Sequence, residues 1–124
     1  MSVNAKDYIE QVSEMSKDEL DRLPLGVITL APDGTVKRYN EAEAVLARKN
    51  QASVIGTNFF TDVAPCTANA NFQGRFQEIV AKEWGITNFD YLFKFPWGDK
   101  SVHVTFVKKK GHQDVDTLIV WRDA

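Results

Sequence analysis

The chain has 124 residues, of which 44% are hydrophobic and 26% are charged, and these values are typical of a single globular domain with one core. Its 15 lysines and arginines and 17 aspartates and glutamates give a formal net charge of −2, which argues against nucleic acid or anionic lipid as a partner. One cysteine excludes an intramolecular disulfide and a thiolate metal cluster. Because the chain opens without a long apolar run, we expect a cytoplasmic protein with neither signal peptide nor membrane span.

The first 24 residues are expected to form two short helices. Four apolar residues recur at helical spacing and predict an amphipathic helix over residues 6–15: Tyr8, Ile9, Val12 and Met15. A second helix is expected to begin after Ser16, because Glu19 three residues later completes a capping box, and to end near residues 23–24.

Two strands and a helical region follow. "GVITL" at residues 26–30 and "TVKRYN" at residues 35–40 predict a β-hairpin, with Gly34 supplying the unusual backbone of its turn. Short helices are predicted at residues 41–48 and 51–55, the second closed by Gly56. The apolar pattern of residues 71–84 predicts a longer helix with one buried face.

Three more strands are expected to complete the chain. They are "NFDYLFKF" at residues 88–95, "SVHVTFVKKK" at residues 101–110 and "TLIVWR" at residues 117–122, joined by polar turns. Two strands, a helical middle and three strands predict an α+β fold with a five-stranded antiparallel sheet. Helical segments on one face of this sheet would leave a pocket between the two layers, where a ligand could bind.

Three stretches are similar to the photoactive yellow protein family: "RYNEAEAVLAR" at residues 38–48, "VIGTNFFTDVAPCT" at residues 54–67 and "NFQGRFQEIV" at residues 71–80. "NFFTDVAPCT" carries most of the resemblance, whereas "GVITLAPDGTVKRYN" alone indicates a generic PAS domain. The resemblance implies a blue-light receptor with the PAS fold. It also implies that residues 1–24 form a helical cap on a PAS core at residues 25–124.

The resemblance further implies a covalently bound chromophore. Cys66 would carry p-coumaric acid as a thioester, with Tyr39 and Glu43 as hydrogen-bond partners of the phenolate oxygen. Glutamate can donate such a bond only when it is protonated, and burial favours this state by raising its pKa. The other residues expected to border the chromophore are Ala47, Lys49, Phe59, Val63, Pro65, Phe93, Phe95 and Trp97.

The chain differs from the best-known family members at four of these positions. Ala47 replaces a threonine that supports the tyrosine, and Lys49 replaces an arginine over the pocket mouth. Phe95 stands where a tyrosine is common, and Trp97 where a methionine is. Ala47 cannot donate a hydrogen bond, and Lys49 lacks a planar group that could stack on the phenol ring. We expect these differences to affect colour and photocycle rate more than chromophore binding.

Each site residue also has an ordinary structural interpretation. Asn40 followed by Glu43 is typical of a capping box at a helix start. Tyr39 at a strand end would be a packing residue with a wet hydroxyl, and Cys66 would be an inert core thiol. The aromatic residues would likewise belong to the core. Taken one at a time, the residues favour these structural roles. The family resemblance favours chromophore binding instead, because it places the residues around one ligand.

Three classes of function follow from the sequence. The favoured one is a photoreceptor in which light isomerises the chromophore, Glu43 protonates the phenolate and the charge left behind opens residues 1–24. The alternative is a chromophore-free PAS module that acts through protein–protein contacts. An enzyme is not expected, because His103 alternates with core valines and His112 lies in a turn, so neither can serve Cys66 as a base. We expect a monomer that signals to an unidentified downstream protein.

Overall fold

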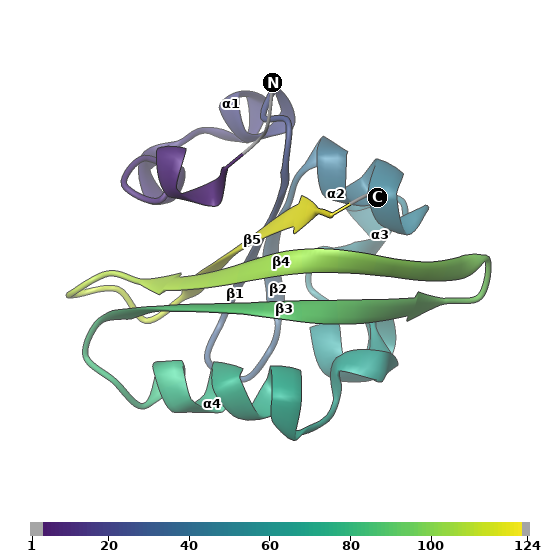
Figure 1. The fold of residues 1–124 in the computed structure, drawn as a ribbon. Coiled ribbons are helices and arrows are strands. Elements are labelled where there is room, and N and C mark those ends of the chain that lie inside the picture. Colours follow the sequence, from purple (N-terminus) through teal and green to yellow (C-terminus); the bar gives the residue numbers. More distant parts are fainter. Residues whose placement is uncertain (1–3, 123–124) are drawn as a thin grey trace.

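The strand order is β2-β1-β5-β4-β3, and every neighbouring pair in this sheet is antiparallel. The computed structural model describes residues 4–122, with helices on both faces of the sheet (Figure 1). The expected α+β fold with a five-stranded antiparallel sheet is confirmed. The strands are β1 (Gly26–Leu30), β2 (Val36–Tyr39), β3 (Gly85–Phe95), β4 (Gly98–Lys108) and β5 (Val115–Trp121).

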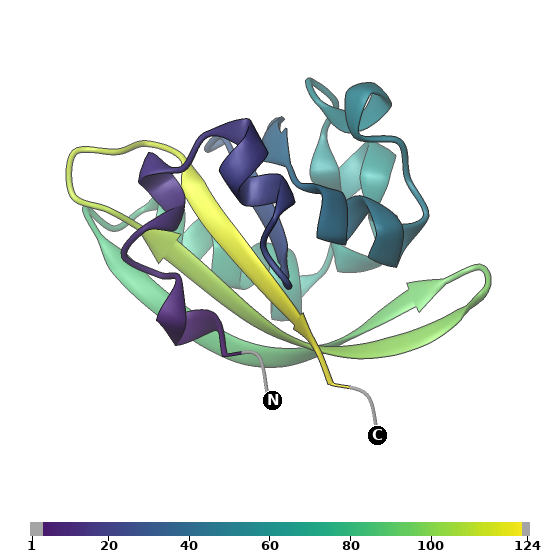
Figure 2. The same ribbon diagram turned by 90° about the horizontal axis from the view of Figure 1, so that it is seen from above.

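The central strands separate two hydrophobic clusters. All five residues of β1 are buried, and side chains in a strand alternate between the two faces of its sheet. Ile28 and Leu30 belong to a larger cluster under the helices that follow β2. Val27 belongs to a smaller cluster with Leu118 of β5, under the N-terminal helices. The N-terminal segment therefore covers one face of the sheet, and the remaining helices cover the other (Figures 1 and 2).

The N-terminal segment contains two single 3₁₀ turns and one short α-helix. They are η1 (Ala5–Asp7), η2 (Val12–Glu14) and α1 (Lys17–Asp21). The predicted capping box is confirmed, since the Ser16 hydroxyl accepts from the Glu19 N–H at 3.2 Å and the Glu19 carboxylate accepts from the Ser16 N–H at 2.9 Å. The boundary at residue 24 between a cap and a core stays a prediction.

The single helix predicted over residues 6–15 is wrong, since the segment forms two separate 3₁₀ turns, and side chains from outside it bind its carbonyl groups. Arg38 in β2 donates hydrogen bonds to the carbonyl oxygens of Val12 and Met15, at 3.1 and 2.9 Å. Lys109, just after β4, donates to the carbonyl oxygen of Glu10 at 2.7 Å. Of these three carbonyl groups, only that of Glu10 would have a partner inside a helix over residues 6–15, because the last four carbonyl groups of a helix have none.

Arg38 is itself anchored in the sheet. Its guanidinium group donates to the hydroxyl of Thr29 in β1 at 2.9 Å and forms an ion pair with Asp116 in β5 at 3.1 Å. The Thr29 hydroxyl in turn donates to the Asp116 carboxylate at 2.6 Å. One side chain thus joins three strands to the N-terminal segment.

The other face of the sheet carries a series of short helices. They are α2 (Glu41–Ala47), α3 (Gln51–Val54), η3 (Phe59–Val63), η4 (Pro65–Thr67), η5 (Ala70–Gly74) and α4 (Arg75–Val80). The helices predicted near residues 41–48 and 51–55 are confirmed. The longer helix predicted over residues 71–84 is confirmed over most of its length, but it opens as a π-turn capped by Asn69 and ends earlier, at Val80. Lys108 of β4 closes this end, because its ammonium group donates to the carbonyl oxygens of Val80 and Lys82 at 2.7 Å each.

Strands β3 and β4 form a long hairpin whose turn projects beyond the other strands (Figure 2). Phe95 pairs with Gly98, so the turn between the strands consists of residues 96–97. Gly98 has a φ of 144°, which a residue with a side chain rarely adopts. Among residues 4–122, every helix falls short of the length and apolar character that a membrane crossing needs.

Candidate functional site

Glu43 is a buried carboxyl group with one unsatisfied oxygen. The residue lies in the first turn of α2 and is 2% exposed. Its Oε1 atom has no hydrogen-bond partner among residues 4–122. Desolvation raises the pKa of this carboxyl to about 8, so the group is protonated and uncharged at neutral pH. Buried polar atoms without a partner are rare in folded proteins, and this one marks a place where a ligand could bind.

The structure contradicts the capping-box interpretation of Glu43. The Asn40 side chain does cap α2, because its Oδ1 atom accepts a hydrogen bond from the Glu43 N–H at 3.1 Å. The reciprocal bond of a capping box is not made, since the Asn40 N–H donates to the carbonyl oxygen of Val27 at 3.0 Å. The Glu43 carboxyl is therefore free of the helix end and lies in the protein interior.

Gly26 leaves the space that the Glu43 carboxyl occupies. A Cβ atom at position 26 in β1 would overlap the Oε1 atom of Glu43. Glycine weakens the interior of a strand, and it often marks a close approach by another group. Any side chain at position 26 would displace the carboxyl from this part of the core.

Tyr39 is the second buried acidic group of the site. It is the last residue of β2, it is 4% exposed and it belongs to the larger hydrophobic cluster. Desolvation and, after it, the charge of Glu43 raise the pKa of the Tyr39 hydroxyl well above its ordinary range. Tyr39 and Glu43 are four residues apart in the chain, and both side chains are buried. Both keep their protons at neutral pH, and both can donate a hydrogen bond.

Cys66 lies in η4, where its backbone is held by side chains from other elements. The residue is half-buried, has a free thiol and packs against the larger hydrophobic cluster. Its carbonyl oxygen accepts hydrogen bonds from the Tyr91 hydroxyl at 2.6 Å and from the Asn69 side-chain amide at 2.9 Å. Asn69 also donates to the Tyr91 hydroxyl at 2.7 Å. Pro65 is exposed and begins η4, where its fixed φ suits a helix start.

The aromatic residues of β3 and its turn form a stack that leads out of the core. Phe93 is 2% exposed, and its ring centroid lies 5.6 Å from that of Phe95, with 30° between the planes. Phe95 in turn stacks on Trp97 at 4.7 Å, with 4° between the planes. Arg48 covers the outer side of this stack, with its guanidinium carbon 4.1 Å from the Trp97 ring centroid.

Lys49 and Ala47 lie in different surroundings. Ala47 is buried in the last turn of α2. Lys49 is exposed and borders a cleft of about 750 Å³ between α1, β2, α2 and α3. Cys66 and Glu43 are not among the residues that line this cleft. The two exposed cations at the end of α2 therefore lie in different places: Lys49 borders the cleft, and Arg48 lies over Trp97.

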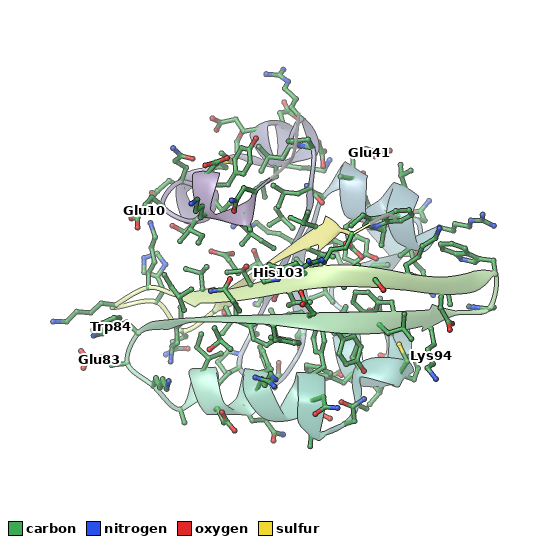
Figure 3. The ribbon with its side chains drawn as sticks, viewed as in Figure 1. Glu10, Glu41, Glu83, Trp84, Lys94 and His103 are labelled. Carbon is green, nitrogen blue, oxygen red and sulfur yellow. The ribbon has the colours of Figure 1, made fainter. Side chains whose placement is uncertain are left out.

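Neither histidine has a place near Cys66. His103 in β4 contacts the Asp90 carboxylate at 3.0 Å and the Asn88 side-chain oxygen at 3.2 Å, both on the exposed side of β3 (Figure 3). His112 lies in the turn between β4 and β5, where its N–H donates to the carbonyl oxygen of Lys109 at 3.0 Å. The thiol thus has no imidazole base beside it among these residues.

No protein-family model matches the chain. It is, however, 41% identical to the photoactive yellow protein of Halochromatium salexigens over 102 residues, which are 82% of each chain. The chain belongs to the photoactive yellow protein family. The resemblance found in the sequence is thereby confirmed.

Solved structures agree with membership of the photoactive yellow protein family. The photoactive yellow protein domain of the sensor histidine kinase Ppr from Rhodospirillum centenum superposes with a TM-score of 0.82 at 31% identity, covering 93% of this chain and 98% of that one. The PAS domain of an HTR-like protein from Haloarcula marismortui gives 0.64 at 18% identity over 93% and 99%, which supports the fold alone. The chain is therefore a PAS-fold member of a photoreceptor family in sensory transduction.

This photoactive yellow protein family member brings most of the expected site residues together. Those that belong to the larger hydrophobic cluster or pack against it are Tyr39, Phe59, Val63, Cys66, Phe93 and Phe95. Glu43 is buried as well, four residues after Tyr39, and Trp97 joins them by stacking on Phe95. Ala47 is one turn after Glu43, whereas Lys49 and Pro65 are exposed. Their roles toward a chromophore stay predictions.

Three residues of the site were missed in the sequence. Tyr91 alternates with Phe89 and Phe93 in β3, and this spacing could have placed it on the same face. Asn69 and Arg48 gave no such signal, because their partners lie on other elements.

Proposed function

We propose that the chain is a blue-light photoreceptor that carries p-coumaric acid as a thioester on Cys66. The observation that carries the proposal is the unsatisfied Oε1 atom of Glu43, in a buried carboxyl group four residues after buried Tyr39. A phenolate oxygen would accept a hydrogen bond from each of these protonated groups, and such charge-assisted bonds are short and strong. Two neutral donors would then face one anion, so that the buried charge is compensated.

The surroundings of Cys66 also suit attachment of the chromophore. The thiol is free, and the backbone that presents it is fixed by the bonds from Tyr91 and Asn69 to its carbonyl oxygen. Phe59 and Phe93 offer apolar surface for an aromatic ring. We propose a receptor and not an enzyme, because the thiol lacks a base and its role here is to hold a prosthetic group.

Glu43 is the proposed proton donor of the light reaction. When bound, p-coumaric acid would supply a double bond that light isomerises from trans to cis. The pKa of Glu43, about 8, lies close enough to neutrality for the proton to be given up when a better base stands beside it. Loss of that proton leaves a carboxylate in an apolar site, which costs several kcal/mol and rivals the stability of a small domain.

Asn40 is the structural link between Glu43 and the N-terminal segment. Its Oδ1 atom accepts from the N–H groups of Glu43 and Val27, at 3.1 and 2.8 Å. Its amide group donates to the carbonyl oxygens of Leu20 and Leu25, at 2.8 and 2.9 Å. All four hydrogen-bonding positions of this buried side chain are used. A shift of α2 at Glu43 would therefore weaken the attachment of α1.

The proposed signal is the release of residues 1–24 from the sheet. Their described part consists of helices too short to be stable alone, and few apolar contacts hold it, among them Val12 and Leu20. Opening the least stable part of the fold is the smallest change that lets water reach the new charge. The released segment would be recognised by a downstream signalling protein, with the receptor itself acting as a monomer.

The test is reconstitution of the purified apoprotein with an activated p-coumaroyl ester. We expect a yellow protein whose mass rises by one p-coumaroyl group, and we expect Cys66→Ala to abolish both changes. Tyr91→Phe serves as the matched control, because it weakens the hold on the Cys66 backbone and keeps the thiol. A colourless protein of unchanged mass would refute the proposal and favour a chromophore-free PAS module.

A further inference from the structure

Arg48 has a strained backbone at the end of α2. Its φ of 56° and ψ of 48° lie in the left-handed region, and it is the only residue other than glycine with a positive φ among residues 4–122. A side chain makes this conformation unfavourable, and it persists where other contacts enforce it. Glycine and asparagine are the residues that usually end a helix in this way. The arginine must therefore gain something at this position that the backbone alone does not provide.

The contact of Arg48 with Trp97 offsets the strain in the Arg48 backbone. The guanidinium carbon lies 4.1 Å from the ring centroid, well within the range of a cation–π interaction. The planar guanidinium group can also stack on an aromatic face, which an ammonium group cannot do. The ion pairs among residues 4–122 do not include Arg48, so its charge is directed to the ring.

Nearby cations make the contrast clear. Lys49, the next residue, borders the cleft beside α1 and α3, and the cations over the Trp97 ring are Arg48 and Lys100. Lys100 in β4 has its ammonium nitrogen 5.9 Å from the Trp97 ring and 4.9 Å from the Trp121 ring. Arg48 is thus the closer of the two cations that contact Trp97, and it comes from the helix that carries Glu43.

The contact ties two parts of the candidate site together. Trp97 belongs to the two-residue turn of the β3–β4 hairpin and lies flat on Phe95, which stacks on buried Phe93. Without a cover, a tryptophan in a projecting turn would be free to leave this stack. Arg48 covers it from the end of α2, opposite to the end where Glu43 lies.

We propose that Arg48 is a positioning residue that holds Trp97 flat on Phe95, and that this contact controls how fast the site returns to its dark state. The second half rests on the proposed function, whereas the first half holds for the apoprotein. Trp97 has to move when the chromophore re-isomerises from cis to trans. A Trp97 ring that Arg48 holds in place therefore slows dark recovery.

The first half is tested in the apoprotein by ¹⁹F NMR after incorporation of 5-fluorotryptophan. Trp97→Phe assigns its resonance, and Trp84, which lies beyond the opposite end of β3 from Lys94, serves as a reference (Figure 3). We expect Arg48→Gln to shift the Trp97 resonance, Arg48→Lys to restore part of the wild-type position, and Lys49→Gln to change nothing. An unchanged Trp97 resonance in Arg48→Gln would overturn the proposal.

Arg48→Gly separates the contact from the stability of the fold. Glycine adopts the left-handed conformation without strain, so the thermal midpoint should not fall, while the Trp97 resonance should shift as in Arg48→Gln. A wild-type Trp97 resonance in Arg48→Gly would mean that the guanidinium group does not hold the ring, and the proposal would be wrong.

The second half is tested on the reconstituted pigment after a blue flash. We expect Arg48→Gln to speed dark recovery about two- to fivefold, the size of an exposed cation–π contact. Lys37→Gln, which removes an exposed cation of β2, should leave the recovery rate unchanged. In a Trp97→Ala background, Arg48→Gln should have no further effect. An equal acceleration in both backgrounds would contradict the proposed route through Trp97. Failure to form pigment would refute the proposed function, while the NMR result would still decide the Arg48–Trp97 contact.

Discussion

The burial of Glu43 should make the apoprotein less stable as the pH rises from 4.5 to 8. The pKa of this carboxyl is about 8 in the folded protein and 4.5 in its ordinary state, which represents the unfolded chain. Below pH 4.5 both states are protonated. Between the two values the unfolded chain has lost the proton and the folded protein has kept it, so the unfolded state binds fewer protons and stability falls with pH. Above pH 8 the effect is complete.

The size of this effect follows from the difference between the two pKa values. A difference of about 3.5 corresponds to up to about 5 kcal/mol of unfolding free energy. That is a large share of the stability of a small domain. Glu43→Gln should remove this contribution, because the amide has a similar shape and does not ionise.

The assay is urea unfolding of the apoprotein at pH 5 and at pH 8, with wild type, Glu43→Gln and Glu41→Gln. Glu41 lies in the same turn of α2 and is exposed, so its variant controls for a change of charge at the helix start (Figure 3). We expect the loss of stability between the two pH values to shrink in Glu43→Gln alone. An identical loss in all three proteins would show that Glu43 is not protonated in the fold, and the proposed donor role would fail with it.

Three further predictions concern the reconstituted pigment. Glu43→Gln should keep the pigment and move its absorbance to longer wavelength, because an amide shares a proton with the phenolate less strongly than a carboxylic acid does and more charge stays on the ring. An unmoved spectrum would exclude Glu43 as a hydrogen-bond partner. Trp97→Ala should change the rate of dark recovery far more than the ground-state spectrum, and equal recovery rates would return Trp97 to surface packing. Hydrogen exchange under steady blue light should lose protection in residues 1–24 and keep it in the sheet, whereas loss confined to the strands would place the signal elsewhere.

Local patterns were enough to predict most elements of the fold. Runs of β-branched or aromatic residues marked the strands, and the turn at Gly34, with its φ of 92°, follows from local backbone sterics. In place of the helix expected over residues 6–15 the structure has two 3₁₀ turns, and Arg38 and Lys109 bind carbonyl groups of this segment. Both side chains lie far along the chain, so a local window of sequence does not contain these contacts.

The candidate site shows the same limit. The spacing of Asn40 and Glu43 predicts a capping box, and half of that motif is present. The other half is absent because the carboxyl fits into the space left by Gly26, on a different strand. The contact of Arg48 with Trp97 was equally invisible, because it joins a helix end to a hairpin turn. Residue types can propose the members of a site, and the tertiary fold decides which of them face each other.

The N-terminal segment is attached to the sheet by hydrogen bonds to its own backbone as well as by apolar contacts. Arg38, Asn40 and Lys109 all bind carbonyl oxygens of the segment or of the residue just after it. Every residue type has a carbonyl group, so many exposed positions of the segment can change without loosening these bonds. Part of the strength of the attachment is encoded in three side chains outside the segment, beside the buried apolar side chains of the segment itself. Anyone who wishes to retune the threshold for its release should therefore alter the surface beneath it and leave the segment itself untouched.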